Sequence, residues 1–109
     1  MTSQIGQTGR PDEAAFDGAR PYEKHPQVAI RREAFGALAY HYGNRRLVFL
    51  KAPALADVVE ALNEFPSAAE AIAAHVGAAQ RDTYARALSG LLSSEVIRPR
   101  EGAHRPPSR

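Results

Sequence analysis

The hydrophobic repeat of this chain changes once, at Lys51, and that change fixes the order of its strands and helices. Before Lys51, short β-branched and aromatic runs have the composition of strands. After Lys51, apolar residues recur every three or four positions, as in amphipathic helices. A chain of 109 residues favours a single domain. We therefore predict an α+β fold in which a three-stranded antiparallel sheet is followed by three helices, in a winged-helix-like arrangement.

The strongest local signal is a hairpin centred on Gly43 and Asn44. Two β-prone runs, 38–42 and 45–50, flank this pair, and Gly tolerates the positive φ that a two-residue turn requires at its first position. A weaker first strand is predicted over 28–31, with a loop over 33–36. The hairpin pairing that follows is Tyr42 with Arg45, His41 with Arg46, Tyr40 with Leu47, Ala39 with Val48, and Leu38 with Phe49.

This pairing also predicts which groups face the core and which face solvent, because side chains alternate between the two faces of a sheet. We expect the bulkier set to face the core: Leu38, Tyr40, Tyr42, Leu47 and Phe49. We expect the smaller, half-polar set to face outward: Ala37, Ala39, His41, Arg46, Val48 and Leu50. Hydrogen-bonded pairs alternate along an antiparallel ladder, so the amides of Arg46, Val48 and Leu50 are expected at the free edge of the third strand.

Three helices are predicted after Lys51. Pro53 suits the first turn of the first helix, and Pro66 helps to end it. Ser67 and Glu70 have the spacing of a capping box that opens the second. The third is predicted from about residue 80 to 93, with an apolar stripe of Tyr84, Ala87, Leu88 and Leu91.

The ends of the chain differ in composition from its centre. Residues 1–20 are rich in Gly and charge, and residues 99–109 hold three Pro and three Arg, so both are expected to be disordered tails around a domain over 21–98. The chain has no Cys, which excludes disulfides and fits a reducing compartment. Its first residues lack the apolar core of a secretion signal, and no apolar run is as long as a membrane span. We therefore expect a cytoplasmic protein without a membrane partner.

The sequence contains no arrangement of residues typical of catalysis. It lacks a nucleophile elbow and a phosphate-binding loop, and its four His residues lack metal-ligand spacing. The carboxylates of Asp57, Glu60 and Glu64 are spaced as a solvated helix face. We therefore predict a protein that is not an enzyme, has no cofactor or metal of its own, and binds other polypeptides.

Charge is unevenly distributed along the chain. Residues 25–51 carry five cations and one anion, a balance of +4, whereas residues 52–95 have a balance of −4. The third strand is expected at an edge of the sheet, flanked by Arg45, Arg46 and Lys51. Such cations either protect the edge from unwanted pairing or favour an acidic peptide that adds a strand there. The Arg residues are too sparse to indicate nucleic acid.

Two segments, 25–31 (HPQVAIR) and 35–51 (FGALAYHYGNRRLVFLK), resemble the mycofactocin biosynthesis chaperones, which belong to the PqqD-like peptide-recognition elements of ribosomal peptide maturation. The helix over 55–62 and the segments 84–88 and 96–99 follow in the same order. The resemblance spans roughly residues 16–100.

This resemblance implies a peptide chaperone. Such a protein binds the leader of a precursor peptide as an added strand, between the third strand and the third helix. It presents that peptide to a radical S-adenosylmethionine maturase, and the iron–sulfur clusters belong to that enzyme. The peptide-binding residues implied here are Arg45, Arg46, Leu47, Val48, Phe49, Leu50, Arg81, Tyr84, Ala85 and Leu88.

Two other classes of protein remain open from the sequence. A winged-helix DNA-binding domain needs a recognition helix with several exposed basic or amide residues, and the third helix offers Gln80, Arg81 and Arg86. A structural accessory subunit would hold an enzyme together without touching its substrate.

Overall fold

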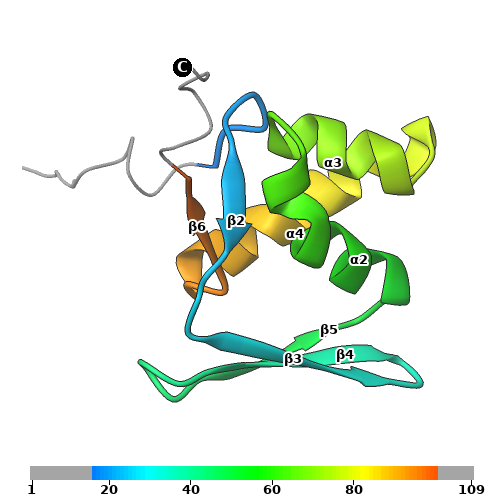
Figure 1. Cartoon of the computed structure of the whole chain (residues 1–109). Coiled ribbons are helices and arrows are strands. Elements are labelled where there is room, and N and C mark those ends of the chain that lie inside the picture. Colours follow the sequence, from blue (N-terminus) through cyan, green and yellow to red (C-terminus); the bar gives the residue numbers. More distant parts are fainter. Residues whose placement is uncertain (1–15, 101–109) are drawn as a thin grey trace, which may run out of the picture.

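All the helices of the described part of the chain lie on one face of a three-stranded sheet, whose other face is bare (Figure 1). The computed structural model describes residues 16–100. The strands are β2 Tyr22–Lys24, β3 Val28–Glu33, β4 Gly36–His41, β5 Leu47–Leu50 and β6 Ile97–Pro99. The helices are α2 Pro53–Ala61, α3 Ala68–His75 and α4 Arg81–Ser93, with short 3-10 turns at Leu62–Glu64 and Ala78–Gln80. The predicted α+β class, with three antiparallel strands and three helices, is confirmed.

The main sheet has the strand order β3-β4-β5, and all its pairs are antiparallel. The register predicted for the hairpin is confirmed from Leu38–Phe49 to Tyr40–Leu47. The first strand is longer than predicted, so the expected loop over 33–36 shrinks to a turn at residues 34–35. Gly36 follows this turn at φ 150°, where an added Cβ would lie 2.1 Å from the Leu50 carbonyl oxygen. This backbone approach requires glycine.

The hairpin turn differs from the predicted two-residue type. The His41 amide donates to the Arg46 carbonyl (2.9 Å), and the Arg45 amide donates to the His41 carbonyl (2.8 Å). Four residues, 42–45, therefore form the loop, and the predicted pair of Tyr42 with Arg45 was wrong. The residue at positive φ is Arg45 (66°) rather than Gly43.

The longer loop keeps the register but reverses the direction of the amides of β5. His41 and Arg46 now close the ladder, so the alternating bonded pairs are Ala39–Val48 and Ala37–Leu50. The expectation that Arg46, Val48 and Leu50 direct their amides to the free edge was wrong. Instead, the amides of Leu47 and Phe49 face that edge.

The two faces of the sheet are also the reverse of the prediction. Ala37, Ala39 and Leu50 are fully buried, whereas the side chains of Leu47 and Phe49 are more than half exposed. The helices lie against the face with the smaller side chains, because alanines allow α2 to approach the backbone of β4 closely. The buried set also includes His41, whereas Tyr42 points to solvent.

The predicted helices are confirmed. Pro53 begins α2, and the Ser67 hydroxyl accepts the Glu70 amide at the start of α3 (3.2 Å). α4 ends with the Glu95 and Val96 amides bonded to the Leu92 and Leu91 carbonyls, a Schellman arrangement. It places Glu95 at φ 67°, where glycine is usual. No helix in the described part of the chain is long and apolar enough to cross a membrane.

A second sheet, β2 with β6, lies beside the helices, and neither β2 nor this pairing was predicted (Figure 1). Tyr22 in β2 is buried and stacks on Phe16, and the Ala68 amide donates to the Arg20 carbonyl. The packed unit therefore extends past the predicted limits of 21 and 98. The tail predictions for 1–15 and 101–109 lie outside the described residues.

Arg100 joins the end of β6 to the turn after α2. Its guanidinium donates to the carbonyls of Tyr22 (2.9 Å), Leu62 (2.8 Å) and Phe65 (2.7 Å). Hydrogen bonds from a charged donor stabilise a fold more than neutral ones do. Removing this donor would also leave three partly buried carbonyls without a partner.

We predict that Arg100→Ala lowers the free energy of unfolding by about 2–3 kcal/mol, a shift in Tm of about 10 °C or more for a domain of this size. The matched control is Arg98→Ala, two residues earlier, which removes a partly exposed ion pair with Glu23 and should cost less than about 1 kcal/mol. Thermal unfolding of both variants measures the two losses of stability. Equal losses would show that the Arg100 hydrogen bonds add nothing specific.

Candidate functional site

β5 lies at the edge of the sheet and has no strand partner on its outer side within residues 16–100. The free backbone groups there belong to Leu47 and Phe49, as the pairing of β5 with β4 dictates. Unpaired amides and carbonyls in a row are a template for another extended chain. The edge can therefore accept a strand through main-chain hydrogen bonds.

Among residues 16–100, the cations around this edge form no ion pairs, unlike those elsewhere on the sheet. Arg31 pairs with Glu33, and Arg32 reaches across to Asp57 and Glu60 of α2. The hydrogen bonds that the Arg32 guanidinium donates to the carboxylates of Glu60 and Asp57 raise the pKa of Arg32. The exposed residues next to β5 form no ion pair with any described residue: Arg45, Arg46 and Lys51. Positive charge is therefore concentrated at the β5 edge.

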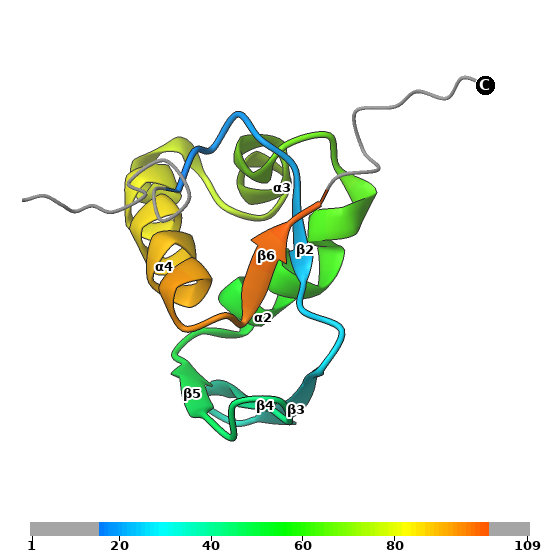
Figure 2. The same ribbon diagram turned by 90° about the vertical axis from the view of Figure 1, so that its left-hand side faces the viewer.

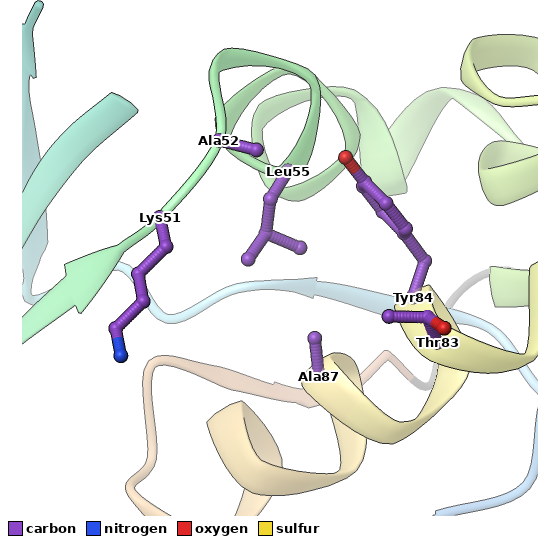
Figure 3. A pocket seen from close by; sticks show the side chains of 6 residues that line it. All are labelled: Lys51, Ala52, Leu55, Thr83, Tyr84 and Ala87. Atoms are coloured by element: carbon purple, nitrogen blue, oxygen red, sulfur yellow. The ribbon is translucent and has the colours of Figure 1, made fainter. Parts of the chain in front are cut away.

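An apolar pocket of about 180 Å³ opens beyond the end of β5, between the start of α2 and the first half of α4. A cavity of about 150 Å³ admits a benzene-sized group, so this pocket can hold one apolar side chain. In Figure 3, Leu55 and Ala87 face each other across the pocket, with Tyr84 on one side and Lys51, which follows β5, on the other. The residues that line it are Lys51, Ala52, Leu55, Thr83, Tyr84 and Ala87.

β5 and α4 lie on the same side of the molecule, as Figure 2 shows. A strand added to β5 would pass the pocket, because Lys51 follows β5 directly and lines it. Side chains of such a strand would alternate between the pocket side and the bare face of the sheet. The edge and the pocket thus form one candidate site.

The structure separates the predicted site residues into three groups. Leu50 and Leu88 are fully buried in the core, so their side chains cannot contact a bound peptide. Val48 is half-buried, and its amide is used by β4. The remaining residues are accessible at the edge or on α4: Arg45, Arg46, Leu47, Phe49, Arg81, Tyr84 and Ala85.

Several pocket residues were not predicted from the sequence. Thr83 and Ala87 lie four residues apart on α4, beside Tyr84, which places all three on one helix face. That spacing was a usable signal for this face. Nothing local indicates Ala52 or Leu55, because they line the pocket only where the start of α2 lies opposite α4. Lys51 was expected only as a cation beside the edge.

His41 fixes the loop at the start of β5. Its Nδ1 accepts the amides of Gly43 (3.0 Å) and Asn44 (3.1 Å), and its ring lies 4.4 Å from that of His25. Burial, together with the neighbouring His41, lowers the pKa of His25. The Nε2 atom of His41 makes no hydrogen bond to any described residue and lies 4.0 Å from the Glu95 carboxylate. This ring therefore positions the loop that leads into the free edge.

Among the described residues, no group of three or more His, Asp or Glu side chains could hold a metal ion. The chemistry of the site is limited to backbone donors and acceptors, an apolar pocket and three cations. Groups of this kind are suited to binding an extended polypeptide, and none of those described is arranged as a nucleophile with a base.

Comparison with known proteins agrees with this geometry. Residues 21–98 match the peptide chaperone MftB family. The peptide chaperone MftB of Mycobacterium tuberculosis is 43% identical over 96 residues, which cover 87% of this chain and 88% of that protein. The proteins of the same name from Mycobacterium ulcerans and Mycolicibacterium smegmatis are 43% and 40% identical, covering 80% and 91% of this chain and 81% and 93% of those proteins.

No solved structure matches the chain significantly. The family match confirms the resemblance to the mycofactocin biosynthesis chaperones. A chaperone family also confirms the expectation that this chain is not an enzyme. With a family model over 21–98 and relatives at 40–43% identity along most of their length, this chain belongs to the peptide chaperone MftB family.

Proposed function

We propose that this chain is a peptide chaperone that binds the leader of a precursor peptide as a strand beside β5 and presents it to a radical S-adenosylmethionine maturase. The observation that carries the proposal is the free edge of β5, where the amides of Leu47 and Phe49 are available beside an apolar pocket. Strand addition supplies affinity through main-chain hydrogen bonds, and pockets for alternate side chains supply specificity.

The positive charge around the β5 edge favours a leader that carries acidic residues. Arg45, Arg46 and Lys51 surround the edge without ion pairs to the described residues, so a bound acidic segment would gain partners that the free protein lacks. If these cations only protect the edge from aggregation, their removal would leave peptide binding unchanged.

The two rival classes differ in measurable ways. A winged-helix DNA-binding role has little support, because the exposed cations of α4 are only Arg81 and Arg86. A structural accessory subunit would not bind the leader in the absence of the enzyme, so titration with labelled leader alone separates it from a chaperone.

We predict that Phe49→Pro abolishes leader binding while the fold persists. Proline removes the Phe49 amide, which faces the free edge and makes no bond to β4. Phe49→Ala is the matched control, since it removes the same side chain but keeps the donor. Val48→Pro should unfold the hairpin, because that amide bonds to β4. Circular dichroism and leader titration are measured on all three; a folded Phe49→Pro that binds like Phe49→Ala would exclude strand addition here.

We predict that Ala87→Leu weakens leader binding by about tenfold, the equivalent of about 1.4 kcal/mol. The larger side chain fills the pocket that an apolar leader residue would enter. Ala74→Leu, at an exposed position of α3, adds the same atoms away from the site. Calorimetric titration of both proteins provides the measurement. Unchanged affinity in a folded Ala87→Leu would show that the leader does not use the pocket.

We predict that leader affinity falls as salt rises, because screening weakens attraction between charges exposed to solvent. The double variant Arg45→Gln/Arg46→Gln should flatten this dependence. The control Arg20→Gln/Arg86→Gln changes net charge equally at exposed positions outside β5 and should keep a steeper slope than the first variant. Titrations at several salt concentrations give the slopes, and a wild-type slope in the first variant would assign those Arg residues to edge protection alone.

A further inference from the structure

The bare face of the sheet carries a cluster of apolar side chains, here named the outer cluster. Four of its members are strongly exposed: Phe35 (46%), Tyr42 (60%), Leu47 (55%) and Phe49 (57%). Tyr40 and Leu38 lie half-buried beside them. Phe35 contacts Phe49 with ring centres 5.7 Å apart, and Tyr40 contacts Tyr42 at 5.3 Å. A contiguous exposed patch of this kind marks an interaction surface.

A leader strand on β5 would cover only one side of the outer cluster. Neighbouring strands lie about 4.8 Å apart, so the added strand would be about 10 Å from β4. Its outward side chains would meet those of Leu47 and Phe49 as cross-strand neighbours. Tyr40 on β4 and Tyr42 in the following loop lie beyond that reach. A broader partner is needed to cover them.

The charges next to the outer cluster distinguish between two possible partners. Arg45, Arg46 and Lys51 adjoin its β5 side and form no ion pair with described residues. A second copy of this chain, packed about a two-fold axis, would bring the same patch and the same cations to the contact. Like charges then repel wherever the bound leader leaves these cations unpaired, whereas a different protein with acidic residues around an apolar centre neutralises them.

We propose that the outer cluster is the docking surface for the enzyme that receives the peptide, through an apolar, acid-rimmed patch on that enzyme. This inference rests on the proposed function. The bound leader extends the sheet next to Leu47 and Phe49, so its outward side chains become part of the same surface. The enzyme therefore contacts the chaperone and the leader together, and binds the chaperone–leader complex more tightly than the chaperone alone.

The test uses the full chain, labelled leader and the radical S-adenosylmethionine maturase. The variant Tyr40→Ser/Tyr42→Ser removes the part of the outer cluster that a leader cannot reach. We expect its leader Kd to stay within about twofold of wild type, whereas enzyme binding to the chaperone–leader complex falls at least about tenfold, as for aromatic residues at an interface centre. Ala73→Ser/Ala74→Ser, at exposed positions of α3, is the control and should change neither affinity.

Circular dichroism verifies the fold, and Tyr42→Ser alone, in the exposed loop, replaces the double variant if that one unfolds. If the folded variant binds the enzyme as tightly as wild type does, the proposed docking surface is wrong. The proposal of leader binding at β5 is not affected by that result. Loss of leader affinity in that variant also overturns it, because the leader would then occupy the cluster. A wild-type chain that binds no leader contradicts the proposed function itself. Self-association of the wild type that the variant abolishes would assign the cluster to a second copy.

Discussion

The close approach of α2 to β4 is the contact on which the rest of this structure depends. Ala37 and Ala39 are fully buried beneath the helical layer, as are Val58 and Val59 of α2. Alanine at both sheet positions leaves room for the helix, and larger residues there would force off-rotamer side chains or backbone shifts. Since the small side chains take the inner face, alternation along β4 and β5 places the aromatic residues on the outside. The same approach sets the start of α2 against α4 and so creates the pocket.

The cations of the sheet fall into two groups, those paired with carboxylates and those without an acidic partner among the described residues. Arg32 points to the inner side with Ala37, its register partner, and bonds to Asp57 and Glu60, which ties the sheet to α2. These two carboxylates were predicted to form a solvated helix face, and they are partly exposed as well as paired. The cations near β5 have no such acceptor among the described residues. The +4 balance read from the sequence is therefore partly neutralised within the fold and concentrated at one edge.

Local signals in the sequence predicted the elements well, and long-range packing decided what they did not predict. The helices, the Ser67 cap and the hairpin register depend on neighbours a few residues apart. The pairing of Tyr22 with Pro99 joins residues from opposite ends of the domain, so no short window of sequence could indicate that β2 and β6 pair. The faces of the sheet were predicted wrongly because apolar bulk was taken to mean burial, whereas helix packing favoured the alanines.

In the candidate site, too, local sequence signals predicted part of the structure and long-range packing decided the rest. Its location at β5 was predicted, but Leu50 and Leu88 were assigned to it although both are core residues. The amide direction was wrong because a two-residue and a four-residue loop give the same register with opposite bonding. The Asn44 side chain, which accepts the Arg46 amide at 2.9 Å, favours the longer loop. That choice depends on side-chain hydrogen bonds of His41 and Asn44 and not on the pattern of apolar residues.

The pairing of β2 with β6 also determines how this domain would respond to a mechanical load. Tyr22 lies opposite Pro99, and Lys24 lies opposite Ile97, so the outer ends of both strands are at the same end of the ribbon. A pull applied at these two ends would open the inter-strand hydrogen bonds one after another, instead of shearing them all together. The ribbon and the Arg100 contacts would yield first, while the strands β3, β4 and β5 lie outside the line of force. A load applied at both ends would therefore open the domain first at the β2–β6 ribbon, before it reaches the strands that carry the candidate site.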